Sequence, residues 1–420
     1  MNRGFYTIMA AQFFSSLADS ALIIVAIGLL TAMKAPASLI PLLKLWFVLP
    51  YVLLAPFVGA FADSMLKGRV MFIANFIKVL GCSLIFFGVH PLVACAVVGF
   101  GAAVYSPAKY GILTELLQAE KLVVANAWIE GLTVMSIILG TVMGGALVST
   151  HGGVWLMHLD LPGVDTGIDT PAKAQLAVLI FTYALAAAFN LRIPDTGARY
   201  ERQESNPARL IADFAECAST LWKDKLGQIS LAVTTLFWGS GATLQFIVLE
   251  WAERSLHMPL DKATTLIGVV AIGVAIGAAL AARLIPLRKA LSVIPLGIIM
   301  GVVVTVMTTV YSIHVAVPLL LIIGLLSGFF VVPMNALLQH RGHVLMSAGH
   351  SIAVQNFNEN LSILTMLAMY AIMLTLKLDL NIIIVLFGLV LAGIMFLIGR
   401  RHAANQRKHD SLALIGEHKH

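Results

Sequence analysis

One apolar run, residues 315–339 (VAVPLLLIIGLLSGFFVVPMNALLQ), decides the class of fold to which this sequence belongs. The run contains no Asp, Glu, Lys or Arg, and it exceeds the roughly 20 apolar residues that a helix needs to cross a bilayer. A basic residue, Arg341, follows two positions after its end. The run therefore predicts a membrane-spanning helix.

The composition extends this prediction to the whole chain. Of the 420 residues, 59% are hydrophobic and 11% are charged, and the mean hydropathy is +0.93. A soluble domain carries about a quarter of its residues as charges, so these charges are too few to solvate a globular surface. We expect an all-α membrane protein with twelve transmembrane helices, and we exclude a soluble enzyme.

The apolar runs place the twelve helices in two sets of six. The first set is expected at residues 6–33, 39–62, 70–90, 92–113, 124–149 and 173–193, and the second at 228–251, 263–285, 290–313, 315–339, 346–376 and 379–399. The expected domains are an N-terminal bundle (1–193), a linker (194–227), a C-terminal bundle (228–399) and a tail (400–420).

The distribution of basic residues orients the chain. Nineteen of the 27 Lys and Arg residues fall on the side of the N-terminus, six fall on the other side, and Lys78 and Lys109 lie within spans. The positive-inside rule then predicts that both termini and the linker are cytoplasmic. Because the basic residues lie between apolar spans, the net charge of +6 does not indicate nucleic-acid binding.

The linker carries an amphipathic pattern. Leu210, Phe214, Cys217 and Leu221 share one face of a predicted helix over residues 207–222. A helix on the cytoplasmic interface that simply joins the two bundles and a regulatory helix both fit this pattern.

Two bundles of six helices joined by a cytoplasmic loop resemble the major facilitator transporters. The loop after the second helix carries Gly59, Asp63, Lys67, Gly68 and Arg69. It resembles the gating loop G-x-x-x-D-R-x-G-R-K of that superfamily, with two additional residues between Asp63 and Gly68. These charges are expected to latch helices together or to act as positive-inside anchors.

Polar residues inside the spans are the candidates for a substrate site, because each costs several kcal/mol unless it faces a cavity or a partner. In the first half, the candidates are Gln12, Ser16 and Asp19 on one stripe, Asn75 and Lys78 one turn apart, Tyr105 and Lys109 around Pro107, and Glu130. Asp19 is expected to face the cavity, and Lys109 either binds substrate or forms a structural ion pair. Lys78 is expected to brace a neighbouring helix or to extend its ammonium towards water, and Glu130 to pair with Lys78 or Lys109.

The second half offers Gln245, then Gln355 and Glu359 one turn apart. The pairs Gly140 and Gly144, and Gly273 and Gly277, predict close helix packing without chemistry. No metal site and no cofactor are expected: Asp160, Asp165 and Asp169 lack the spacing of a calcium loop, and no Walker loop is present.

Several blocks resemble the bacterial lysophospholipid transporter family. They include APFVGAFADS (55–64), YSPAKYGIL (105–113), LFWG (236–239), GFFVVP (328–333), NALLQ (335–339) and IAVQN (352–356). They occur in both halves and in the expected order.

The resemblance implies transfer of lysophosphatidylethanolamine and related lysolipids from the periplasmic to the cytoplasmic leaflet of the bacterial inner membrane by alternating access. It also implies reacylation by an acyltransferase, expected here as a separate partner. Lys109 would meet the lipid phosphate, and Asp19 or Glu359 the ethanolamine ammonium. Gln245 stands where the family commonly has a basic residue. The alternative is a proton-coupled drug or metabolite efflux transporter in which Asp19 or Glu359 titrates.

Overall fold

The structure, a computed structural model, describes residues 3–36, 39–149, 168–200, 206–258, 260–408 and Ile415. These residues form helices and connecting loops, and no strand occurs among them. Eleven helices of this part of the chain are long and apolar enough to cross a membrane, and a bent pair gives a twelfth if it is counted as one span. The predicted all-α fold is thereby confirmed.

The chain divides into two compact units. The first unit comprises residues 1–116 and 135–212, and the second comprises residues 117–134 and 213–420. The helix α6 (Leu122–Val148) therefore contributes its beginning to the second unit and its end to the first. The domain boundaries expected from the sequence, which place this helix wholly in the N-terminal bundle, stay a prediction.

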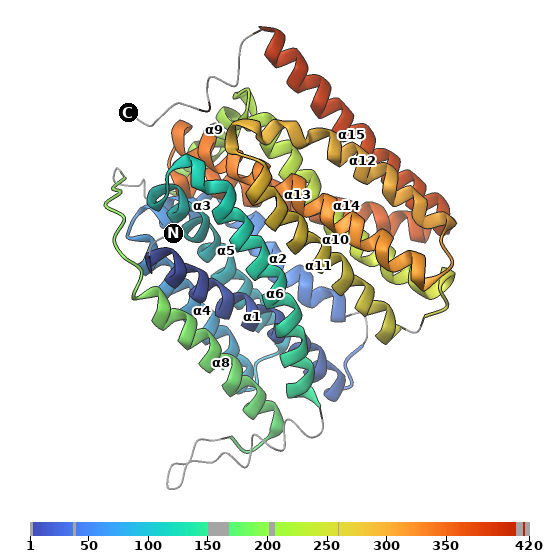
Figure 1. The fold of residues 1–420 in the computed structure, drawn as a ribbon. Coiled ribbons are helices and arrows are strands. Elements are labelled where there is room, and N and C mark those ends of the chain that lie inside the picture. Colours follow the sequence, from blue (N-terminus) through green and yellow to red (C-terminus); the bar gives the residue numbers. More distant parts are fainter. Residues whose placement is uncertain are drawn as a thin grey trace. The chain divides into compact units, whose positions relative to one another are not determined.

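Seven helices build the first unit. They are α1 (Arg3–Ala32), α2 (Leu39–Leu53), α3 (Ala55–Asp63), α4 (Lys67–Phe86), α5 (Pro91–Leu116), the end of α6, and α8 (Pro171–Asn190). The blue α4 and the green α8 pack against each other, and α8 also packs against α1 (Figure 1). This arrangement brings residues from four helices to one polar cluster.

The predicted helix over residues 39–62 is bent rather than straight. It consists of α2 and α3, whose axes differ by 65°. Pro56 lies at the start of α3 and has no N–H to donate to the carbonyl of Val52, so the helix cannot continue through this point. The Leu54 carbonyl instead accepts the N–H groups of Phe57 and Val58, at 2.9 and 3.0 Å.

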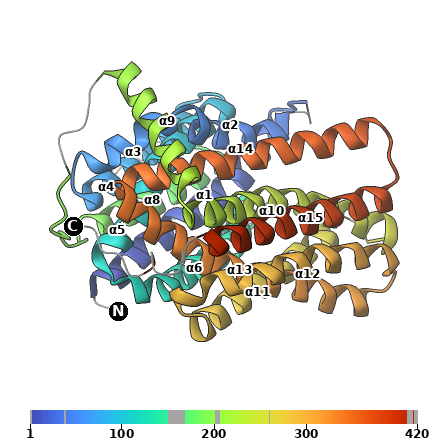
Figure 2. The ribbon, with the colours of Figure 1, turned by 90° about the horizontal axis from the view of Figure 1, so that it is seen from above.

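The second unit contains six long helical segments. They are α10 (Gly227–Ser255), α11 (Leu260–Leu284), α12 (Ile294–Thr305) with short 3-10 turns Leu287–Val293 and Val306–Thr309, α13 (Ile313–Leu345), α14 (Ala348–Thr375) and α15 (Leu380–Lys408). Figure 2 shows α11, α12 and α13 side by side. Helix α15 extends beyond the predicted end at residue 399, through Arg400 and Arg401.

Glycines let α11 and α13 touch along their backbones. A Cβ at Gly277 would lie 2.0 Å from the Leu325 carbonyl oxygen, and one at Gly328 would lie 2.0 Å from that of Val274. In the first unit, a Cβ at Gly140 would lie 2.5 Å from the Leu17 carbonyl oxygen. The prediction of close packing at Gly140, Gly144, Gly273 and Gly277 is confirmed, because a Cβ at each would lie 2.0–2.9 Å from a backbone carbonyl oxygen of a neighbouring helix.

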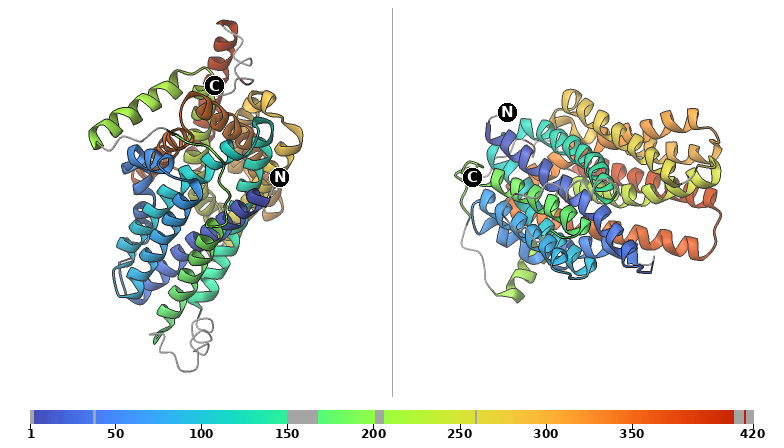
Figure 3. Two further views of the ribbon diagram at one scale, coloured as in Figure 1. Left: turned by 90° about the vertical axis from the view of Figure 1, so that its left-hand side faces the viewer. Right: turned by 90° about the horizontal axis from the view of Figure 1, so that it is seen from below.

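The linker contains the predicted helix, α9 (Pro207–Lys223), shown in green in Figure 3. Phe214 and Leu221 are buried, as expected for the apolar face, whereas Ile211 and Trp222 are exposed. Within the second unit, the Phe214 ring lies edge-on against Phe357 of α14 at 5.5 Å. The apolar face of α9 thus packs partly on protein.

Candidate functional site

A buried ion pair joins α1 to α4 in the first unit. The Lys78 ammonium donates to both carboxylate oxygens of Asp19, at 2.9 and 2.7 Å. The Lys78 side chain is 2% exposed and that of Asp19 is 20% exposed. Each charge is costly inside an apolar bundle unless it is compensated, so the pair stabilises both charges and fixes the two helices against each other.

Neighbouring side chains complete this cluster. The Tyr183 hydroxyl of α8 donates to Asp19 at 2.7 Å. Lys78 also donates to the Ser15 hydroxyl at 3.0 Å, and Ser15 donates to the Asn75 side-chain oxygen at 2.8 Å. Asp19 therefore accepts hydrogen bonds from an ammonium on α4 and a phenol on α8. These two donors stabilise the negative charge that α1 carries.

Two donors beside the cluster have no partner among the described residues. They are the Asn75 amide nitrogen and the Tyr105 hydroxyl, and both are buried. The Lys78 nitrogen lies over the Tyr105 ring, 5.3 Å from its centroid, so the face of the ring borders the ion pair. Since buried donors normally find an acceptor, these two groups are suited to a ligand that brings acceptor oxygens next to Lys78.

The other predicted residues of the first unit lie on the same helices. Gln12 is buried on α1 and donates to Ser16 at 2.8 Å. Lys109 lies one turn after Tyr105 on α5, half-buried, with its nitrogen 4.1 Å from the centroid of the Tyr110 ring. The predicted substrate contacts of both residues stay predictions.

Lys78 differs in part from the sequence interpretation. Its ammonium braces α1, whereas extension towards water does not occur because the side chain is buried. Its partner within the first unit is Asp19. Glu130 lies on α6 in the second unit and is 3% exposed, and its pairing with Lys78 or Lys109 stays a prediction.

The second unit has a polar cluster built from amides. The Gln355 side-chain nitrogen on α14 donates to Glu359 at 2.8 Å and to Asn335 of α13 at 3.2 Å. All three side chains are buried. Gln245 lies on α10 with an exposed side chain, and its substrate contact stays a prediction.

A reciprocal amide pair lies on α6 and α13, also in the second unit. Asn126 donates to Gln339 at 2.9 Å, and Gln339 donates back at 2.9 Å. Both residues are buried. Two hydrogen bonds between two neutral side chains fix the orientation of each amide without any charge.

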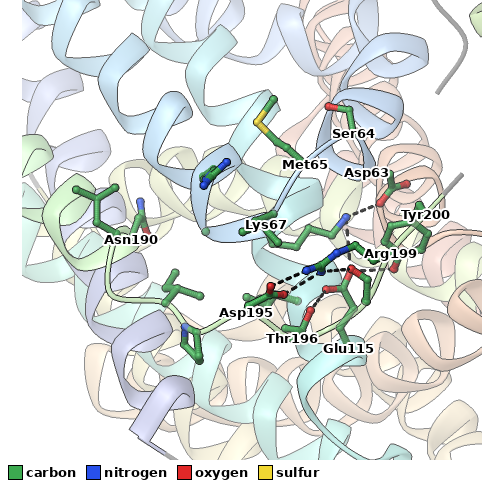
Figure 4. A pocket seen from close by; sticks show the side chains of 18 residues that line it. Asp63, Ser64, Met65, Lys67, Glu115, Asn190, Asp195, Thr196, Arg199 and Tyr200 are labelled. Carbon is green, nitrogen blue, oxygen red and sulfur yellow. Dashed lines mark hydrogen bonds and ion pairs between the residues drawn. The ribbon is translucent and has the colours of Figure 1, made fainter. Parts of the chain in front are cut away.

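The predicted latch residues form a charge cluster where α3 ends and α4 begins (Figure 4). Lys67 is buried and pairs with Asp63. Its nitrogen also lies 3.6 Å from the Glu115 carboxylate at the end of α5 and donates to the Ala62 carbonyl at 2.9 Å. Arg69 is exposed. These contacts connect the end of α3, the start of α4 and the end of α5, as expected of residues that latch helices together. A role in gating stays a prediction.

Residues at the beginning of the linker form hydrogen bonds with Glu115. Thr196 and Tyr200 each donate to its carboxylate at 2.8 Å. Arg199 donates to both oxygens of Asp195, at 3.0 and 2.7 Å. These bonds, together with one from the Gly197 N–H, lower the pKa of Asp195 to about 2.

Several residues of these clusters were missed from the sequence, among them Ser15, Tyr183, Glu115 and Asn335. Tyr183 offered a signal, because it is the one tyrosine in the apolar span 173–193. Ser15 lies one turn before Asp19, whereas Glu115 and Asn335 gave no sign of their partners.

Nothing in the described residues groups three His, Cys, Asp or Glu side chains around a metal position. Asp169 forms an ion pair with Lys173 at 2.5 Å, and hydrogen bonding from Lys173 lowers its pKa. Asp160 and Asp165 lie outside the described residues. His409, His418 and His420 of the predicted tail do so as well.

Known proteins resemble this chain in both sequence and fold. The sequence pattern of the Major Facilitator Superfamily matches residues 8–364. The lysophospholipid transporter LplT of Yersinia enterocolitica is 39% identical over 377 residues, covering 90% of this chain and 88% of the relative. That of Yersinia pestis is 40% identical over the same length and coverage.

Solved structures share the fold at low identity. A bacterial homologue of the iron transporter ferroportin superposes with a TM-score of 0.71 at 13% identity, over 97% of this chain and 100% of the other. The transporter FucP superposes with a TM-score of 0.69 at 13% identity, over 95% and 98% of the two chains. At such identity these two structures establish the fold alone.

Proposed function

The chain belongs to the Major Facilitator Superfamily and to its lysophospholipid transporter family, and we propose that it moves lysophosphatidylethanolamine and similar single-chain phospholipids between the two leaflets. The direction is from the periplasmic to the cytoplasmic leaflet of the bacterial inner membrane, by alternating access without covalent chemistry. In this proposal both termini are cytoplasmic, which the excess of basic residues on their side supports.

The observation that carries this mechanism is the buried Asp19–Lys78 pair, in a chain 39–40% identical to lysophospholipid transporters over 90% of its length. The head group of the proposed cargo is itself an ion pair, with a phosphate and an ammonium. The lipid can therefore exchange partners with the protein: its phosphate takes Lys78, and its ammonium takes Asp19. Every charge stays compensated during the exchange.

The energetic argument favours such an exchange over simple opening of the pair. Removing one partner of a buried ion pair costs about 3–5 kcal/mol. A zwitterion avoids most of that cost, while a neutral sugar or an anion alone does not. The unpartnered Tyr105 hydroxyl and Asn75 amide nitrogen are placed to donate to the incoming phosphate.

Lys109 extends the proposed path within the first unit: one turn after Tyr105, it receives the phosphate as it leaves Lys78. In the second unit, Glu359 with Gln355 is a separate candidate acceptor for an ammonium. A separate acyltransferase on the cytoplasmic side then adds the second acyl chain, which removes the lysolipid and drives net transfer.

The test follows labelled lysophosphatidylethanolamine in spheroplasts that contain or lack the protein, with its conversion to the two-chain lipid as readout. Protein-dependent conversion is expected, and no difference between the two preparations would refute the proposal. A strict requirement for a proton gradient, with drug export and without lysolipid uptake, would establish proton-coupled efflux instead.

A charge-swapped variant separates binding from bracing. Asp19→Lys with Lys78→Asp keeps an ion pair between α1 and α4 but reverses its direction relative to Tyr105. If the pair only braces the helices, the swap retains uptake. Partner exchange predicts that the swapped protein folds and that uptake falls at least tenfold, about 1.4 kcal/mol.

A further inference from the structure

A second polar site lies beside the charge cluster, within the first unit. A cavity of about 590 Å³ is lined by the start of α4, the end of α8 and the linker residues that follow it (Figure 4). Its volume is within the range of roughly 300–1,000 Å³ that small-molecule sites occupy. None of the residues proposed above to bind the transported lipid lines it.

The start of α4 presents hydrogen-bond donors to this cavity. The residue before the helix is Leu66, which has no side-chain oxygen to cap it. The N–H groups of Lys67 and Gly68 make no hydrogen bond within the described residues, and the first turn contains no acidic side chain. Arg69, exposed in the same turn, also lines the cavity and has no ion pair in this part of the chain. Free amides at the positive end of a helix favour an anion.

Asn190 supplies an independent sign of a ligand. It is the last residue of α8, is 1% exposed and lines the cavity, and neither its amide nitrogen nor its amide oxygen has a partner among the described residues. An unsatisfied buried amide costs about 1–3 kcal/mol, so Asn190 requires a bound ligand or an ordered water as its partner. Asn190 is also next to the start of α4, because a Cβ at Gly68 would lie 3.1 Å from its carbonyl oxygen.

The remaining charges of the cavity are already compensated by each other. Lys67 pairs with Asp63 and Glu115, and Glu115 also accepts from Thr196 and Tyr200. Arg199 pairs with Asp195. The groups left open are therefore almost all donors: two backbone amides, one guanidinium and the Asn190 amide nitrogen. This set matches the oxygens of a phosphate.

We propose that this cavity binds the phosphate group of a phosphate ester, held by the first amides of α4, Arg69 and Asn190. The Asn190 oxygen accepts from a hydroxyl or ammonium of the same ligand. The cavity has room for the group attached to the phosphate, which belongs either to a soluble ester or to the head group of a phospholipid in the adjoining leaflet.

The experiment titrates full-length protein in detergent with glycerol 3-phosphate and follows the unfolding temperature and the Kd. A parallel arm measures by native mass spectrometry whether the protein retains phosphatidic acid. Saturable binding in either arm is expected, with Arg69→Gln and Asn190→Ala each weakening it roughly tenfold or more. Binding in the first arm identifies a soluble ester, and binding in the second alone identifies a lipid.

A matched control is Arg192→Gln, which removes the same charge from an exposed arginine that does not line the cavity. It should bind as the wild type does. The proposal is overturned if neither probe binds, if Arg69→Gln binds with unchanged affinity, or if Arg192→Gln weakens binding as much as Arg69→Gln. Because Arg69 is exposed, its variant folds even if Asn190→Ala does not.

Discussion

The Asp19 cluster of the first unit and the amide clusters of the second unit use different chemistry. In the first unit, Asp19 is held by the Lys78 ammonium and the Tyr183 hydroxyl. In the second, Glu359 accepts from the Gln355 amide, and the Asn126–Gln339 pair consists of amides alone. The cluster around Asp19 therefore stabilises charge with charge, and these two clusters of the second unit rely on amides. The buried ion pair of the second unit, Arg341 with Asp224 at 2.7 Å, belongs to neither of them.

The difference predicts unequal responses to mutation. An ion pair that loses one member leaves an uncompensated charge in an apolar bundle, whereas an amide that loses its partner leaves only an unsatisfied dipole. The Asp19–Lys78 pair should therefore respond more strongly than the amide clusters to single substitutions, and should recover when both of its members are changed together.

The largest effect is expected at Lys78. Lys78→Met leaves the partly buried Asp19 carboxylate without its cation and should lower the free energy of unfolding by about 3 kcal/mol, the lower end of the cost for a buried pair, whereas Glu359→Gln should cost about 1–2 kcal/mol. Thermal unfolding of the purified variants compares them. The double variant Asp19→Asn with Lys78→Met should be more stable than Lys78→Met alone. Equal losses of unfolding free energy for Lys78→Met and Glu359→Gln would show that the ion pair is no more sensitive to substitution than the amide cluster.

A smaller effect is expected at Tyr183. Tyr183→Phe removes a hydrogen bond to a charged group and should cost about 1.5–3 kcal/mol while leaving the ion pair in place. Lysolipid uptake and thermal unfolding measure the result. In the background of Asp19→Asn the same substitution should cost less, since the acceptor is then neutral. A cost that does not depend on the Asp19 charge would contradict a role in stabilising it.

In the second unit, a double-mutant cycle tests the amide pair. Asn126→Leu and Gln339→Leu should each cost about 1–3 kcal/mol, because each leaves one buried amide unsatisfied. The double variant should cost less than the sum of the two. Additive losses would show that the two amides are not coupled, contrary to their 2.9 Å contacts.

The smallest effect concerns the exposed pair Arg199–Asp195. Since the pKa of Asp195 is lowered from 3.8 to about 2, the stabilisation by this pair is present above pH 4 and is lost as the pH falls through 2. Carboxyl-carbon NMR of labelled protein should show a midpoint near 2, and Arg199→Gln should raise it towards 3.8. An unchanged midpoint in that variant would assign the shift to the Gly197 N–H instead.

The sequence predicted the number and type of the helices, because runs of about 20 apolar residues are unmistakable and charges mark their ends. It did not predict the bend at Leu54, although Pro50 and Pro56 were visible, because both fit a continuous apolar run. The predicted end of α15 at residue 399 is too early, because Arg400 and Arg401 end the apolar run but not the helix.

The candidate site was predicted only in part. Asp19, Asn75, Tyr105 and Lys78 were selected as polar residues in apolar spans, which hydropathy alone permits. Their pairing was not predicted, because Asp19 and Lys78 lie 59 positions apart and the rotation of each helix is set by packing. The same holds for Asn126 and Gln339, which are 213 positions apart.

The reciprocal amide pair also determines how this part of the molecule responds to ionic strength. Dissolved salt screens the attraction between exposed charges, and the screening length falls from about 10 Å at 0.1 M to about 3 Å at 1 M. Added salt therefore weakens the exposed pair Arg199–Asp195. Asn126 and Gln339 are buried and carry no net charge, which leaves nothing for the ions to screen. The contact between α6 and α13 should therefore persist in concentrated salt, where exposed ion pairs of the linker are weakened.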